Sequence, residues 1–63
     1  MRNNADIADE ILRNAAMAEG IERLNLLNSA ANYILSVPDG NIKEGLRERH
    51  QELYEPFLGL DDY

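Results

Sequence analysis

Apolar side chains recur at helical spacing along most of the chain, and this pattern predicts an all-α protein. From residue 5 to residue 37 there is no proline and only one glycine, Gly20, while alanine and leucine are frequent. Helix is therefore favoured throughout this stretch. Asn3 or Asn4 is suited to its start, because an asparagine side chain accepts a hydrogen bond from an otherwise unpaired amide. The sequence predicts a helix over about 4–36.

A turn follows at residues 37–41, which read Val-Pro-Asp-Gly-Asn. Proline disfavours helical geometry in the residue before it, and aspartate and glycine are both suited to a tight turn. The chain should therefore reverse its direction here. A shorter helix is predicted over about 42–55, ending before Pro56, and residues 56–63 are predicted to form a tail.

The apolar face of the first stretch changes direction at Gly20. With a rotation of about 100° per residue, the apolar side before Gly20 is continued after it by polar side chains. The main apolar side of residues 21–37 is turned by roughly half a revolution. We interpret this as a long helix bent or broken near Gly20, because no loop residues surround it and helix connections usually need about two to eight. A reversal at Gly20, giving a three-helix bundle, is the alternative.

Residues 21–37 are apolar over more than half of the helix circumference, which is typical of a helix buried from two sides. The last helix has a narrow apolar stripe and can cover only one of them. A chain of 63 residues has a marginal core of its own, and association commonly compensates for this. A single domain over 1–63 that forms a twofold homodimer is therefore predicted. The dimer interface is expected at Ile21, Leu24, Leu27, Ala31, Ile34 and Leu35.

The charge balance indicates the kind of partner. Twelve acidic and six basic side chains give a net charge of -6. Direct binding to nucleic acid or to an anionic membrane is disfavoured, because both need clustered Lys and Arg. A protein partner with a basic surface is expected instead. No apolar run approaches the length of a membrane span or resembles a signal peptide, so a cytoplasmic location is expected.

Catalytic and metal-binding patterns are not found in the sequence. There is no cysteine, and the single histidine, His50, has Leu46 and Tyr54 one helical turn away, neither of which could share a metal or orient the ring. No glycine-rich phosphate loop and no nucleophile with a nearby base are present. We therefore expect a protein that is not an enzyme and that needs no metal or cofactor.

Four glutamates stack on one face of the last predicted helix, and we call them the acidic ladder. They are Glu44, Glu48, Glu52 and Glu55. Like charges at this spacing repel each other. One interpretation is a solvated face whose charge is partly offset by Lys43, Arg47 and Arg49. The other is a contact surface for an Arg-rich partner. If both subunits of a dimer supply acidic residues to one continuous belt, this surface would mimic the phosphates of a nucleic acid.

The tail combines apolar and acidic side chains after a helix breaker. In one interpretation it is a short docking motif, in which Phe57 and Leu60 anchor in a groove of the partner while Asp61 and Asp62 meet basic groups. In a second it folds back to cover the bundle, and in a third it is disordered.

A dimeric helical hairpin of this length is similar in architecture to the plasmid-encoded RNA-binding Rop proteins, but the basic face needed for RNA is missing here. In size and charge the chain resembles small acidic helical phage proteins that disable host machinery, anti-CRISPR proteins among them. Together these features predict a binding module that regulates or inhibits a larger macromolecule by occupying its surface. A nucleic-acid mimic that competes for a phosphate-binding channel and a structural subunit of an assembly are the alternatives.

Overall fold

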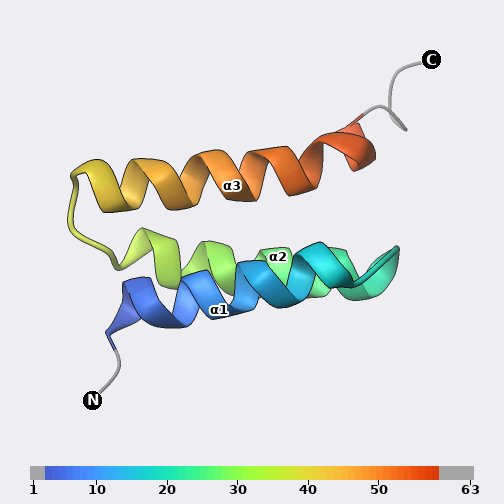
Figure 1. The fold of residues 1–63 in the computed structure, drawn as a ribbon, viewed down its shortest axis with the longest axis horizontal. Coiled ribbons are helices and arrows are strands. Elements are labelled where there is room, and N and C mark those ends of the chain that lie inside the picture. Colours follow the sequence, from blue (N-terminus) through green and yellow to red (C-terminus); the bar gives the residue numbers. More distant parts are fainter. Residues whose placement is uncertain (1–2, 59–63) are drawn as a thin grey trace.

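Three helices make up the fold of residues 3–58, the part of the chain that this computed structural model describes (Figure 1). Helix α1 spans Asn4–Met17, α2 spans Ile21–Leu35 and α3 spans Asn41–Leu58. The described residues contain no strand, which confirms the all-α prediction. In Figure 1, α1 and α3 run from left to right and α2 runs from right to left, so α2 is antiparallel to both of its neighbours.

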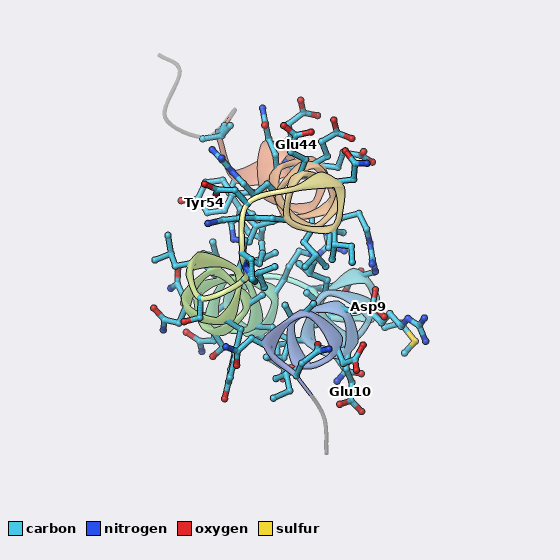
Figure 2. All side chains as sticks on the ribbon, turned by 90° about the vertical axis from the view of Figure 1, so that its left-hand side faces the viewer. Asp9, Glu10, Glu44 and Tyr54 are labelled. Atoms are coloured by element: carbon cyan, nitrogen blue, oxygen red, sulfur yellow. The ribbon has the colours of Figure 1, made fainter. Side chains whose placement is uncertain are left out.

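The three helices lie at the corners of a triangle when the bundle is viewed along its axis (Figure 2). Helices α1 and α2 approach each other much more closely along their length than either approaches α3. Alanines explain the close approach, because Ala8, Ala15 and Ala30 are fully buried and small side chains let two helix backbones come near each other. The pair α1 and α2 is therefore the more tightly packed half of the molecule.

The core of residues 3–58 is small, and Leu12 and Leu27 are its largest fully buried side chains. Its members are Ala8, Leu12, Ala15, Leu27, Ala30, Ile34, Val37 and Leu46. Leu46 is the single fully packed contribution of α3, which adds Leu53, Tyr54 and Phe57 as partly buried side chains against the core. Helix α3 is therefore attached through a narrow stripe and leaves most of its surface to solvent.

Local signals set the first helix start and the main turn as the sequence predicts. The side chain of Asn3 accepts a hydrogen bond from the backbone N–H of Asp6 at 2.8 Å, so α1 begins with an asparagine cap. The chain turns between Leu35 and Asn41, and the carbonyl of Gly40 accepts from the N–H of Glu44 at 3.0 Å in the first turn of α3. The predicted reversal at 37–41 is confirmed.

The helix predicted over 4–36, bent or broken near Gly20, is interrupted at residues 18–20, where the chain reverses fully and gives the three-helix bundle that was the alternative (Figure 1). Ala18 is extended, with φ -93° and ψ 164°, and Gly20 has φ 62° and ψ -134°, a conformation open to glycine but not to residues with a Cβ. Three connecting residues are therefore enough to turn the chain, and the break near Gly20 is a reversal although no typical loop residues surround it.

Arg23 closes the exposed end of α1 at this reversal. Its Nε donates to the carbonyls of Ala15 and Ala18, both at 3.0 Å, and its Nη2 donates to the carbonyl of Ala16 at 3.3 Å. The last carbonyls of a helix have no partner within the helix, so a guanidinium that reaches several of them acts as a cap. Helix α1 thus ends on a side chain from α2, which ties the two helices together.

The predicted end of the last helix at about residue 55 is wrong, because α3 continues through Pro56 to Leu58. A proline lacks the N–H that would bond the carbonyl four residues earlier, here that of Glu52. Glu52 is exposed, so water can take the place of that donor, and one lost bond in the final turn does not stop the helix.

Candidate functional site

The acidic ladder lies on the outer face of α3. All four of its glutamates are exposed. Glu44, which marks its beginning, points away from α1 and α2 (Figure 2). The helix places these side chains on one side because their spacing follows its turn of about 3.6 residues. The sequence therefore located this surface correctly.

The basic residues of α3 do not neutralise the ladder as expected. Lys43 pairs with Asp39 at 3.4 Å, and Arg49 pairs with Asp9 of α1. Within residues 3–58 no ladder carboxylate takes part in an ion pair. Arg47, the third cation of α3, lines a surface hollow with Glu44 and Glu48 but makes no ion pair within residues 3–58. In the described part of the chain the ladder is thus a row of carboxylates without ion pairs.

Asp9 holds α1 and α3 together through charge. Its Oδ1 accepts from Nη1 of Arg49, and its Oδ2 lies 3.1 Å from Nε of Arg13 one turn along α1. The hydrogen bond from Arg49 and the attraction of both guanidiniums lower the pKa of Asp9 below its ordinary value of 3.8, against the opposing effect of burial. Asp9 is therefore ionised at neutral pH and contributes an interhelix contact that the sequence did not reveal.

Replacing Asp9 with asparagine should lower the free energy of unfolding at pH 7 by about 1 kcal/mol or less, because its partners are partly exposed and screened by water. A carboxyl whose pKa is depressed by folding stabilises the fold above its unfolded pKa, and this stabilisation is lost as pH falls through the folded pKa. Urea unfolding at pH 7 and at successively lower pH should show a difference between wild type and Asp9→Asn that shrinks as the carboxyl is protonated. A difference that persists in acid would contradict the charge-based contact, and Asp39→Asn, which removes a fully exposed partner of Lys43, is the control.

His50 joins α3 to α2 by a hydrogen bond. Its Nε2 lies 3.0 Å from the carbonyl oxygen of Leu27, so this nitrogen donates, and its ring stacks on Tyr54 with centroids 6.0 Å apart. His50 is half-buried. The described residues bring no three His, Asp or Glu side chains together in a way that could hold a metal ion.

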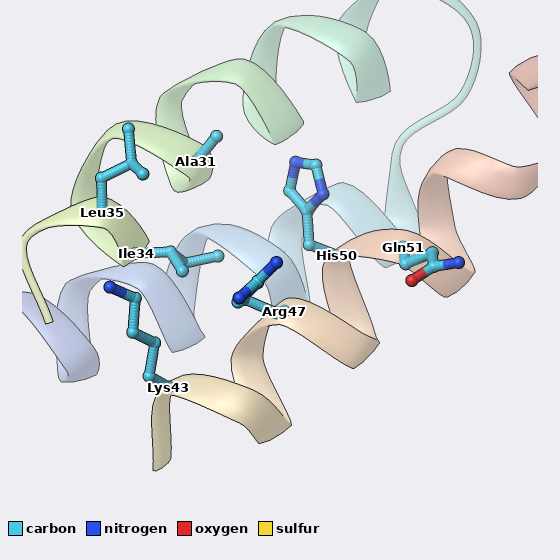
Figure 3. Close-up of a pocket in the computed structure, with 7 residues that line it drawn as sticks. All are labelled: Ala31, Ile34, Leu35, Lys43, Arg47, His50 and Gln51. Atoms are coloured by element: carbon cyan, nitrogen blue, oxygen red, sulfur yellow. The ribbon is translucent and has the colours of Figure 1, made fainter. Parts of the chain in front are cut away.

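A groove of about 460 Å³ opens between α2 and α3 beside His50 (Figure 3). Helix α2 lines it with Ala31, Ile34 and Leu35. The opposite wall is polar and comes from α3, with Lys43, Arg47 and His50 among its residues (Figure 3). The sequence analysis missed this groove, because its two walls come from helices whose relative rotation the sequence does not specify.

The six residues expected at a dimer interface do not share one environment. Leu27 and Ile34 are buried in the core of the single chain, while Leu24 and Ala31 are half-buried. Ile21 and Leu35 remain 72% and 75% exposed. The apolar breadth of α2, which motivated the dimer, is thus largely covered by α1 and α3 of the same chain.

Of the residues expected to bind a partner from the tail, only Phe57 lies within the described part of the chain. Phe57 is half-buried, packs against the core and lies 6.1 Å from the ring of Tyr54 at an angle of 59°. Phe57 therefore packs within the helical bundle. Leu60, Asp61 and Asp62 lie outside the described residues.

Comparison with known proteins adds no family to this description of a small three-helix bundle. No family model matches the chain, and neither a curated protein nor a solved structure matches it. Within residues 3–58 no helix has both the length and the apolar character needed to cross a membrane. The chemistry of its own surfaces is therefore the basis for a functional proposal.

Proposed function

We propose that this chain is a non-enzymatic binding module that regulates or inhibits a larger partner by placing the acidic ladder on a basic surface of that partner. The observation that carries the proposal is that four exposed carboxylates share one face of α3 without an ion pair within residues 3–58. Neighbouring like charges on a helix cost a few tenths of a kcal/mol, roughly 0.2–0.5 kcal/mol per pair. The ladder therefore does not help the fold, and its charge is available to a partner.

A basic partner surface would relieve this repulsion on contact. Complementary charge speeds association and sets orientation more than it adds affinity. Since the carboxylates are exposed, salt should weaken the contact as it screens them. The proposal thus specifies a partner with clustered Arg or Lys and a complex that dissociates as the salt concentration rises.

The test compares two variants of equal net charge. Glu48→Gln with Glu52→Gln removes the centre of the ladder, while Glu19→Gln with Glu22→Gln removes two exposed carboxylates next to the start of α2. A partner captured by the wild type and verified with purified components should be lost by the first variant and kept by the second, and its affinity should fall with added salt. Equal binding of that partner by both variants would refute the role of the ladder.

A mimic of nucleic acid is a narrower form of the same proposal. The ladder extends over 11 helical steps from Glu44 to Glu55, about 16 Å along the helix axis, and presents its charges in single file as one strand of a backbone does. Under this form, a DNA or RNA oligonucleotide should compete with the chain for the partner. Simultaneous binding of both would restrict the proposal to ordinary contact with a basic protein surface.

The homodimer remains a separate proposal with fewer residues to support it. Of the six expected interface residues, Ile21 and Leu35 are the exposed ones, and they are separated by 14 positions in α2, or about 21 Å along its axis. They do not form one patch, so we expect a monomeric mass for the isolated protein in light scattering at micromolar concentration. A dimeric mass that Leu35→Ala converts to the monomer would establish the homodimer.

A further inference from the structure

The groove between α2 and α3 differs in chemistry from the acidic ladder on the same helix. Its floor is apolar, because Ile34 is buried there and Leu35 beside it is 75% exposed. A single exposed leucine is ordinary on a protein surface. This leucine, however, lies at the rim of a hollow of about 460 Å³ (Figure 3), where an apolar group could be buried against it.

The wall opposite the apolar floor is basic. Lys43 and Arg47 are one helical turn apart on α3, and both line the groove (Figure 3). The side chain of Lys43 is only 18% exposed, so its aliphatic stem is covered while its amine reaches Asp39. Arg47 is exposed and makes no ion pair within residues 3–58. Arg47 thus offers the groove a guanidinium without an ion pair in the described part of the chain, although Glu44 and Glu48 lie near it.

Other cations of the described chain have structural partners. Arg13 and Arg49 pair with Asp9, and Arg23 caps the carbonyls that end α1. Arg47 has no such role in the fold. Its charge therefore marks the groove as a place where a carboxylate could be held.

We propose that the groove binds an acidic amphipathic helix of a partner protein. A leucine-like side chain of that helix would pack on Ala31 and Leu35, and carboxylates one turn apart would reach Lys43 and Arg47. From Lys43 to Gln51 the groove follows eight steps of α3, about 12 Å, which accommodates two turns of a bound helix. Anchors at such spacing are how amphipathic helices bind in grooves.

The chemistry of the groove favours a peptide over a nucleic acid. A nucleic acid needs many cations to replace its counterions, and it offers no aliphatic side chain for Leu35. The net charge of -6 opposes any anion at long range, but at about 0.15 M salt this repulsion is screened beyond roughly 8 Å while direct contacts in the groove persist. Arg47 and Gln51 also border Glu44 and Glu48 of the ladder, so the two surfaces adjoin on α3. The groove does not depend on the function proposed for the ladder, because its apolar floor comes from α2 and its charges are positive.

The test measures binding of a fluorescein-labelled helical peptide, built from leucine and glutamate at helical spacing, to the full chain by fluorescence anisotropy at about 0.15 M salt. Leu35→Ala should weaken binding by about tenfold, and Arg47→Gln by about fivefold. Arg13→Gln removes the same charge from an exposed residue on α1 and should leave binding unchanged. Circular dichroism must show the wild-type helix content for each variant.

Four results would overturn the proposal. The first is the absence of peptide binding, and the second is an equal loss for Arg13→Gln and Arg47→Gln, which would show that net charge alone is sensed. The third is equally tight binding of a labelled single-stranded oligonucleotide of the same charge, which would show that the apolar floor has no role. If light scattering shows a dimer that Leu35→Ala dissociates, a second copy covers the groove and the peptide does not.

Discussion

Replacing Leu27 with alanine should unfold a large fraction of the protein at 25 °C. Leu27 is fully buried at the centre of α2, and removing a buried leucine side chain to the β-carbon costs about 2–5 kcal/mol. A domain of 63 residues has a total stability of about 3–9 kcal/mol, at roughly 0.05–0.15 kcal/mol per residue. One substitution can therefore consume most of the stability. Urea unfolding followed by circular dichroism at 222 nm would measure the loss.

Leu35→Ala is the matched control for this prediction. It makes the same chemical change in the same helix, but Leu35 is 75% exposed, so its cost should stay within about 0.5 kcal/mol. A similar loss for both substitutions would mean that α2 does not bury the face seen here. The pair therefore tests the rotation of α2 about its own axis, on which the core and the α2 and α3 groove both depend.

The elements whose signals are local in sequence were predicted well. Asn3 caps α1 by accepting a hydrogen bond from the amide of Asp6, three residues later. Pro38 and Gly40 mark the turn into α3. The acidic ladder was also placed correctly, because four glutamates at helical spacing must share a face of any helix they occupy. Each of these features needs only a few neighbouring residues to be specified.

The buried face of α2 was predicted only in part. Beside the main apolar side, which includes Leu27 and Ile34, α2 carries a weaker apolar edge that includes Ala30, and the structure buries residues of both. Ala30 is fully buried, and a small side chain of this kind is compatible with the close packing of α1 and α2. A helical wheel shows only which side chains of one helix are apolar and gives no information on the shape of the helix that packs against it. The predicted buried face of α2 therefore included Ile21 and Leu35, which are exposed.

Contacts between distant residues could not be predicted from the sequence. Arg49 lies 40 positions from Asp9, and the expectation that it would offset the ladder was reasonable from spacing alone. Once α3 lies against α1, Asp9 is the carboxylate that two guanidiniums share. The fold of residues 3–58 thus directs Arg49 away from the ladder, which makes no ion pair within these residues.

Replacing Gly20 with alanine should change the fold from a three-helix monomer toward a long-helix dimer. A Cβ at this position would meet no atom within 4 Å, so any cost comes from the backbone alone. At φ 62° and ψ -134° that cost is about 1–3 kcal/mol for a residue other than glycine. Within a continuous helix, by contrast, alanine is favoured over glycine by about 1 kcal/mol.

These two effects act in the same direction and sum to about 2–4 kcal/mol, a shift of about 30- to 900-fold toward the continuous helix. A helix running through residue 20 carries α1 away from Leu27 and Ile34, whose burial then requires α1 of another chain. Exchange of α1 between two copies restores the contacts of the core and forms a closed dimer. Light scattering should show a doubled mass for Gly20→Ala, with helix content equal to or above that of the wild type.

Gly45→Ala separates this effect from the general gain of replacing a glycine. Gly45 lies within α3, and its added Cβ would also meet no atom within 4 Å, so alanine should stabilise the monomer by about 0.5–1 kcal/mol. If Gly20→Ala stays monomeric and fully folded, the reversal at residues 18–20 does not depend on glycine, and the three carbonyls held by Arg23 must suffice to fix it. If Gly20→Ala dimerises and Gly45→Ala does not, one backbone conformation decides whether α2 is covered by its own chain or by a second copy.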